Sequence, residues 1–98
     1  MTTFKLVLEY DGTHYAGWQR QSNVPTIQAT LEDALAAIAQ TRLTVVGAGR
    51  TDAGVHALGQ VASFRTDRGL SQREWLRALN AHLPADISAL SVDEVPDD

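Results

Sequence analysis

Residues 46–57 hold the side chains in this chain that are best suited to chemistry. The segment is rich in glycine and places Arg50 two positions before Asp52. Glycine lets the backbone take left-handed angles and lets a bulky ligand approach closely. A carboxylate on such a loop can act as a nucleophile or a base, and a nearby cation favours its ionised form. Aspartates in glycine-rich turns also commonly bond their own backbone, so composition alone leaves a structural role for Asp52 open.

Three other kinds of site fit this segment poorly. A phosphate-binding P-loop requires a glycine five residues before Gly49 and a lysine after it, but Thr44 and Arg50 occupy those positions. A dinucleotide-binding fingerprint requires a helix directly after its glycines, where this chain is expected to form a strand. The three histidines are too scattered along the chain for a zinc site. None of these three kinds of site is therefore expected in this segment.

Four strands are predicted around this segment. Alternating apolar and polar residues predict a strand over residues 4–10, followed by a polar loop. Residues 43–46 are a short β-branched stretch on the N-terminal side of the segment. Residues 58–64 predict a third strand, in which Gly59 marks a bulge or a point of close packing. Residues 87–95 predict the last strand.

Two helices are expected between these strands. Thr26 is a suitable N-cap for a helix over residues 27–38, whose apolar residues recur at three- and four-residue spacing. Ser71 and Glu74 have the spacing of a capping box, in which each side chain bonds the other residue's backbone. Pro84 ends this second helix.

The resulting order of elements is β-α-β-β-α-β. It predicts an α+β domain of the ferredoxin-like kind, with one antiparallel sheet and both helices on one face. Leu90 and Val92 are expected on the same face of the last strand. The sheet's other face is left open, and a ligand, an RNA or a second domain could cover it.

Composition sets broad limits on function. The 98 residues suit one small domain, and the absence of cysteine excludes disulfides and thiolate metal sites. No apolar stretch suits a signal peptide or a membrane span, so we expect no membrane association. The net charge of −4 at first argues against an RNA partner. Four of the twelve acidic residues lie in the last six positions, however, and the remainder of the chain is balanced in charge.

Two blocks of sequence resemble one family. Residues 49–57, GRTDAGVHA, resemble the signature of the TruA-type tRNA pseudouridine synthases, and residues 10–21, YDGTHYAGWQRQ, resemble a block near the N-terminus of those enzymes. Shorter matches at residues 26–28, 59–61, 80–84 and 95–98 follow in the family's order. The resemblance extends over essentially the whole chain.

The resemblance implies a cytoplasmic isomerase that converts uridine to pseudouridine at positions 38, 39 and 40 of the tRNA anticodon stem-loop. It implies a homodimer in which each tRNA contacts both subunits, with no metal or cofactor. Asp52 occupies the place of the family's essential catalytic residue. Arg50 occupies the place of the arginine that helps to displace the target base.

Other residues of the two blocks are candidate contacts. Tyr15, Trp18 and Arg20 suit RNA binding or base flipping, because aromatic rings beside a cation can stack on bases. Anchoring of the loop by Tyr15 and Trp18 is an equal alternative. His56 is expected to give structural support rather than to catalyse. Three further residues are expected to shape the loop: Gly49, Thr51 and Gly54.

The chain departs from the family in length. Residues 1–98 correspond to an N-terminal domain that carries the catalytic aspartate, and the family continues into a second domain. That domain supplies a tyrosine that stacks on the target uracil and a basic residue that pairs with the aspartate. We therefore expect this chain alone to be inactive or nearly so, and its open sheet face to be the docking surface of the missing half.

Two other classes of function remain as alternatives. The first is a non-catalytic RNA-binding module of RRM-like topology, which stacks bases on aromatic residues of its sheet. Residues 58–65 offer a single aromatic residue for this, Phe64. The second is a small-ligand regulatory domain that dimerises through its sheet, and it would not require the arginine and aspartate of the glycine-rich segment.

Overall fold

The fold is that of a computed structural model, which describes residues 1–47, 54 and 56–96. In this part of the chain, four strands and two α-helices follow in the order predicted from the sequence pattern, and a 3-10 helix that was not predicted follows the first strand. Their bounds are β1 Thr2–Tyr10, η1 Gly12–His14, α1 Ile27–Ala39, β2 Val45–Gly47, β3 Ala57–Thr66, α2 Gln72–His82 and β4 Ile87–Val95.

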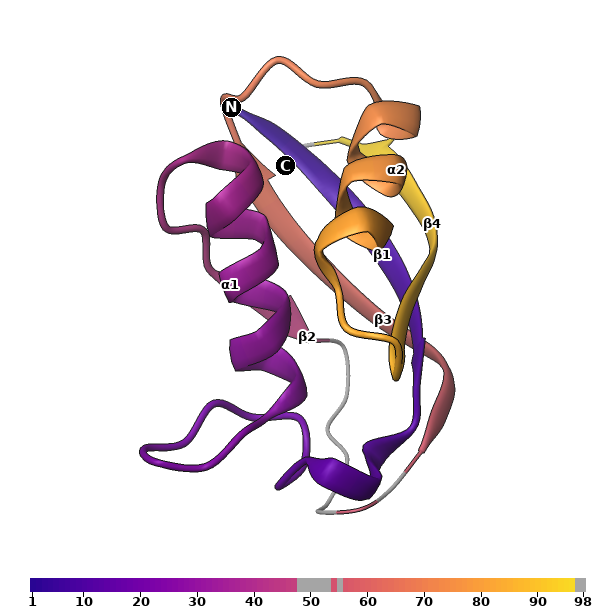
Figure 1. The fold of residues 1–98 in the computed structure, drawn as a ribbon. Helices are drawn as coiled ribbons and strands as arrows, with labels where there is room; N and C mark the ends of the chain where they lie inside the picture. The colour runs from indigo at the N-terminus through magenta and orange to yellow at the C-terminus, as the bar shows by residue number, and fades with distance from the viewer. Residues whose placement is uncertain (48–53, 55, 97–98) are drawn as a thin grey trace.

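The strands form a single antiparallel sheet in the order β2-β3-β1-β4. Both helices lie on the same side of this sheet, α1 beside β2 and α2 beside β4 (Figure 1). The predicted α+β, ferredoxin-like arrangement is confirmed. β1 and β3 occupy the centre, and in the sequence residues 48–56 separate β2 from β3.

The core lies between the sheet and the helices. Alternate residues of β1 are buried and the residues between them face away, as the strand pattern predicts. At the centre, the ring centroids of Phe4 and Phe64 lie 5.4 Å apart, and that of Trp75 lies 5.1 Å from Phe64 in an edge-to-face arrangement. Such aromatic pairs stabilise a core beyond the area they bury. The helices contribute further fully buried side chains: Ile27, Leu31, Leu35 and Leu79.

Both helices begin where their caps predict. The Thr26 side chain accepts a hydrogen bond from the backbone N–H of Ala29 and caps α1. At the start of α2, Ser71 Oγ accepts from Glu74 N–H, and a Glu74 carboxylate oxygen accepts from Ser71 N–H at 2.9 Å. These bonds lower the pKa of Glu74, because they favour its ionised form.

Two irregularities shift the register of the sheet. In the β1–β3 pairing, Gln60 pairs with Leu8 and Ala57 with Tyr10, so Leu58 and Gly59 together lie opposite Glu9. Of the two alternatives predicted for Gly59, this irregularity agrees with the bulge. A second bulge in β4 shows that the prediction for Leu90 was wrong. Val92 is buried, but Leu90 is 46% exposed, because Leu90 is the extra residue in the pairing with β1. The alternation of buried and exposed side chains along a strand is interrupted at such an extra residue.

Some boundaries also differ from the prediction. β2 begins two residues later than expected, at Val45, and β3 is longer at both ends. The loop after β1 opens with the short 3-10 helix η1, in which Asp11 accepts a hydrogen bond from Thr13 N–H. Among the described residues, none of the helices has the length and apolar character that crossing a bilayer requires.

Candidate functional site

The candidate site is built around the segment that connects β2 to β3. Gly49, Arg50, Thr51 and Asp52 lie outside the described residues, so their predicted roles remain predictions. The structure does describe both flanks of the segment. It also describes the other predicted site residues: Tyr15, Trp18, Arg20 and Gly54.

The N-terminal flank is packed against Trp18. This side chain is 3% exposed, and Gly47 approaches its indole so closely that a methyl group at Gly47 would lie 2.6 Å from Nε1. Atoms do not approach to that distance without a shift of one group, so a glycine at this position permits the contact. A buried indole has no free face for a base, so its position fits the anchoring alternative for Trp18.

The C-terminal flank is bonded to the block that follows β1. Gly54 N–H donates to the carbonyl oxygen of Tyr15 at 3.1 Å, and Gly12 N–H donates to His56 Nδ1 at 2.9 Å. Gly54 has a φ of +77°, a conformation that glycine adopts without strain. The two sequence blocks, about forty residues apart along the chain, are therefore in direct contact.

His56 Nδ1 has two competing neighbours. Besides the Gly12 N–H group, Asp11 Oδ1 lies 3.1 Å away. One nitrogen cannot accept and donate at the same time. The neutral ring accepts from Gly12 and carries its proton on Nε2, whereas a doubly protonated ring donates to Asp11. The pKa of Asp11 is lowered, chiefly by hydrogen bonds from the Thr13 side chain and backbone, because these bonds favour the ionised carboxylate.

Tyr15 is fixed at both ends. Its hydroxyl donates to Asp86 Oδ1 at 2.7 Å, and its backbone carbonyl oxygen accepts a hydrogen bond from Gly54 N–H. Burial first, and then the Asp86 carboxylate, raise the pKa of Tyr15 well above its usual range, because both disfavour a phenolate. Asp86 also contacts the same block through its carbonyl oxygen, which accepts from Asp11 N–H at 2.9 Å.

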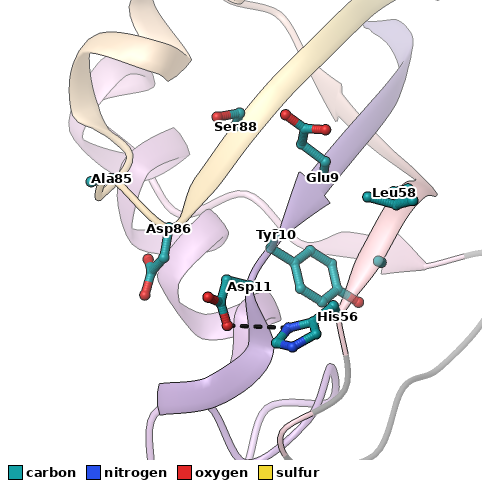
Figure 2. A pocket seen from close by; sticks show the side chains of 9 residues that line it. Glu9, Tyr10, Asp11, His56, Leu58, Ala85, Asp86 and Ser88 are labelled. Atoms are coloured by element: carbon teal, nitrogen blue, oxygen red, sulfur yellow. Dashed lines mark ion pairs between the residues drawn. The ribbon is translucent and has the colours of Figure 1, made fainter.

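An open cavity of about 410 Å³ lies beside this contact (Figure 2). Glu9, Asp11 and Asp86 place three carboxylates around it, and His56 lies within bonding distance of Asp11. Leu58, which is 85% exposed, forms an apolar part of the wall. This wall does not suit a phosphate group, because ionised carboxylates repel it. Within the described ranges, no group of acidic and histidine side chains has a geometry that would hold a metal ion.

Arg20 faces the helix rather than the cavity. Its Nε lies 2.8 Å from Glu32 Oε1, and its side chain is 42% exposed. A second, longer contact of 3.9 Å joins its guanidinium to Asp33. The predicted role of Arg20 in RNA binding is not tested by this arrangement, but part of its charge is already balanced by Glu32.

Sequence reasoning missed two residues of this region. Glu32 is buried and bonds β2, and Asp86 bonds both Tyr15 and Asp11. Gln28 and Glu32 lie four residues apart beside the apolar stripe of α1, and a carboxylate at such a position was a usable signal. Asp86 follows the stop at Pro84, and no pattern along the chain distinguishes it from an ordinary turn residue.

Residues 6–98 match the family described as tRNA pseudouridine synthase. The chain belongs to this family. It is 53% identical over 98 residues to tRNA pseudouridine synthase A of Afipia carboxidovorans, covering 99% of this chain and 40% of that protein. It is 51% identical over 96 residues to the protein of that name from Geobacter sp. strain M21, covering 98% and 39%. The corresponding protein of Rhodopseudomonas palustris is 52% identical over 99 residues, covering 100% and 40%.

The chain therefore spans about two fifths of the length of these synthases. The relatives that are named as synthases are longer than this chain. The family match covers both sequence blocks that were identified above, including the positions outside the described residues.

Proposed function

We propose that the full-length protein isomerises uridine to pseudouridine in tRNA, at positions 38, 39 and 40 of the anticodon stem-loop. The family match over residues 6–98 is the observation that carries this proposal. The signature around Asp52 supports the finer assignment, and so do the contacts that hold both flanks of the segment. In this proposal the functional protein is a homodimer that binds tRNA.

Asp52 is the proposed catalytic residue. The reaction breaks the N1–C1′ glycosidic bond, turns the uracil and joins C5 to C1′. Asp52 can attack C1′, or it can remove a ribose proton and give a glycal-like intermediate. Either route uses an ionised carboxylate, which the cationic Arg50 favours. The proton lost from C5 at the end of the reaction balances the one gained at N1.

Arg50 is proposed to assist base flipping. A uridine in a stem is stacked, and moving it out costs about a few kcal/mol. A planar guanidinium can fill the vacated space and donate hydrogen bonds to phosphate. The negative cavity wall formed by Glu9, Asp11 and Asp86 cannot attract the RNA backbone. In this proposal, arginines such as Arg50 attract the phosphates.

The test is an Asp52→Ala substitution in the protein at the full length of its relatives. Unmodified tRNA labelled with tritium at uridine C5 releases tritium when pseudouridine forms. We expect Asp52→Ala to abolish this release and to leave the tRNA dissociation constant nearly unchanged. Asp67→Asn is the matched control, because Asp67 is an exposed aspartate after β3, and it should behave as the parent protein.

The alternatives give different results in the same assay. A parent protein that binds tRNA but releases no tritium would favour a non-catalytic RNA-binding module. A protein that does neither would favour a ligand-binding domain. Full activity of Asp52→Ala would refute the role of Asp52 while leaving the isomerase activity in place.

A further inference from the structure

Among the described residues, Glu32 is the one charged residue that is buried, with 7% of the residue's surface exposed. A buried carboxylate is costly to a fold unless hydrogen bonds and an opposite charge compensate it. The reaction proposed above makes no use of Glu32. The cost of burying Glu32 must therefore be offset by another contribution, which comes from the groups that it bonds.

Glu32 is bonded by three donors from three parts of the chain. Oε1 accepts from Arg20 Nε at 2.8 Å, which brings in the loop before α1. Oε2 accepts from Val45 N–H at 2.9 Å and from Gln28 Nε2 at 3.3 Å. The carboxylate thus joins the loop, α1 and the first residue of β2.

Gln28 also bonds the first residue of β2. Its Nε2 also donates to the carbonyl oxygen of Val45 at 3.2 Å, while its Oε1 accepts from Arg20 N–H at 2.9 Å. Both backbone polar groups of Val45 are therefore bonded to side chains of α1. These bonds matter because β2 has three residues and pairs with three residues of β3, so its own ladder is short.

β2 leads directly into the segment of the candidate site. Arg50 and Asp52 follow Val45 by five and seven residues. Gly47, the last residue of β2, is packed on Trp18, two residues before the Arg20 that pairs with Glu32. The point where the segment leaves the sheet is therefore held from α1 and from the loop before it.

We propose that Glu32 is a positioning residue for the reaction. Through Val45 it fixes the strand that directly precedes the segment of Arg50 and Asp52 in the sequence. This inference rests on the proposed function and assigns no contact between Glu32 and RNA. A displacement of about 1 Å at a reacting group can cost about a hundredfold in rate. Loss of the bond between Glu32 and Val45 should therefore lower the rate of the chemical step.

The test uses Glu32→Gln in the protein at the full length of its relatives. The amide keeps the shape of the side chain, but it cannot offer acceptors to Arg20, Val45 and Gln28 together. We expect the single-turnover rate constant at saturating enzyme to fall by about tenfold to a hundredfold. The tRNA dissociation constant should stay within about twofold, because the residues that bind phosphate are unchanged.

Asp33→Asn is the matched control. Asp33 is the next residue of α1, its side chain is 68% exposed, and it pairs with Arg42 and more distantly with Arg20. It should leave both the rate and the affinity at their parent values. A purely structural role of Glu32 predicts a lower melting temperature and an unchanged rate for the folded fraction, and that result would overturn the proposal.

A second variant covers the case in which Glu32→Gln does not fold. Gln28→Leu removes the bond to the Val45 carbonyl and leaves Glu32 bonded to Val45 N–H and Arg20. It should lower the rate in the same direction by a smaller factor, and a parent-like rate would refute the proposal. An inactive parent protein would refute the proposed function itself, whereas an active parent with a fully active Glu32→Gln would refute the positioning role alone.

Discussion

The contact between Trp18 and Gly47 determines which side chains are allowed at the end of β2. The nearest indole atoms to a methyl group at Gly47 would be Nε1, Cε2 and Cζ2, at 2.6, 2.8 and 3.0 Å. Trp18 is buried among core residues and cannot move aside freely. Any side chain larger than hydrogen therefore forces a shift of β2 or of the indole.

A Gly47→Ala substitution should therefore destabilise the fold. We expect the free energy of unfolding to fall by about 1–3 kcal/mol, the usual cost of overpacking, as measured by urea denaturation. Gly59→Ala is the control, because a methyl group there meets no atom within 4 Å. In a Trp18→Leu background the indole ring atoms beyond Cδ are absent, so the cost of Gly47→Ala should shrink. Equal costs in both backgrounds would contradict the assignment.

Residue types were easier to predict than residue partners. Asp11 and His56 stand in the two recognised blocks, but no spacing rule predicts that Gly12 N–H bonds His56 across 44 positions. The same holds for Glu32 and Val45, which are 13 residues apart. Periodicity reports which face a residue occupies, whereas these bonds depend on how one element lies against another.

At the scale of elements, α2 covers the outer edge of the sheet. Asn80 Nδ2 donates to the carbonyl oxygen of Ala89 at 2.9 Å, and Asn80 Oδ1 accepts from Ala89 N–H at 2.8 Å. Gln72 Oε1 accepts from Glu94 N–H. β4 is an outer strand, and open edges are templates for pairing with other chains. The two amide side chains occupy positions where another strand would bond.

Asn80→Ala should weaken the fold by leaving two partly buried backbone groups of Ala89 without their partner. We expect a loss of about 1–3 kcal/mol in the free energy of unfolding, measured by urea denaturation. Size-exclusion chromatography should also show more self-association, because part of the β4 edge is opened. Arg73→Ala, at an exposed position of α2, is the control. An unchanged stability of Asn80→Ala would show that water replaces the lost bonds fully.

The elements themselves were largely predictable from local rules. The capping box at Ser71 follows from residue types and spacing, and the glycine at position 59 indicated a bulge as one of two alternatives. The bulge at Leu90 was missed, because a leucine within a strand does not indicate that the pairing of hydrogen bonds is interrupted there. The late start of β2 was missed too, because Leu43 and Thr44 favour a strand but have no pairing partner in β3.

At the scale of the molecule, one core is found in a chain that spans about two fifths of the length of its relatives. A single cluster of buried residues draws on all four strands and both helices. The opposite face of the sheet carries exposed apolar residues such as Val46, and the chain has two fifths of its relatives' length. The buried cluster joins every strand and both α-helices of the described residues, whereas the relatives named as synthases are longer chains.

We therefore expect the 98-residue chain alone to fold and yet to release no tritium from labelled tRNA. Its unfolding in urea should be cooperative, with coincident transitions by far-UV circular dichroism and by fluorescence. The full-length protein, assayed beside it, is the positive control. Normal turnover by the 98-residue chain would show that the remaining sequence is dispensable, and a non-cooperative transition would show that the core depends on it.

The position of Trp18 also gives the molecule an optical reporter. The chain has two tryptophans, and Trp75 lies deep among the core aromatic residues, whereas Trp18 touches the last residue of β2. With Trp75 replaced by phenylalanine, the emission spectrum would come from Trp18 alone. Its wavelength and quenching would then follow, without any added dye, how the base of the Arg50–Asp52 segment responds when RNA arrives.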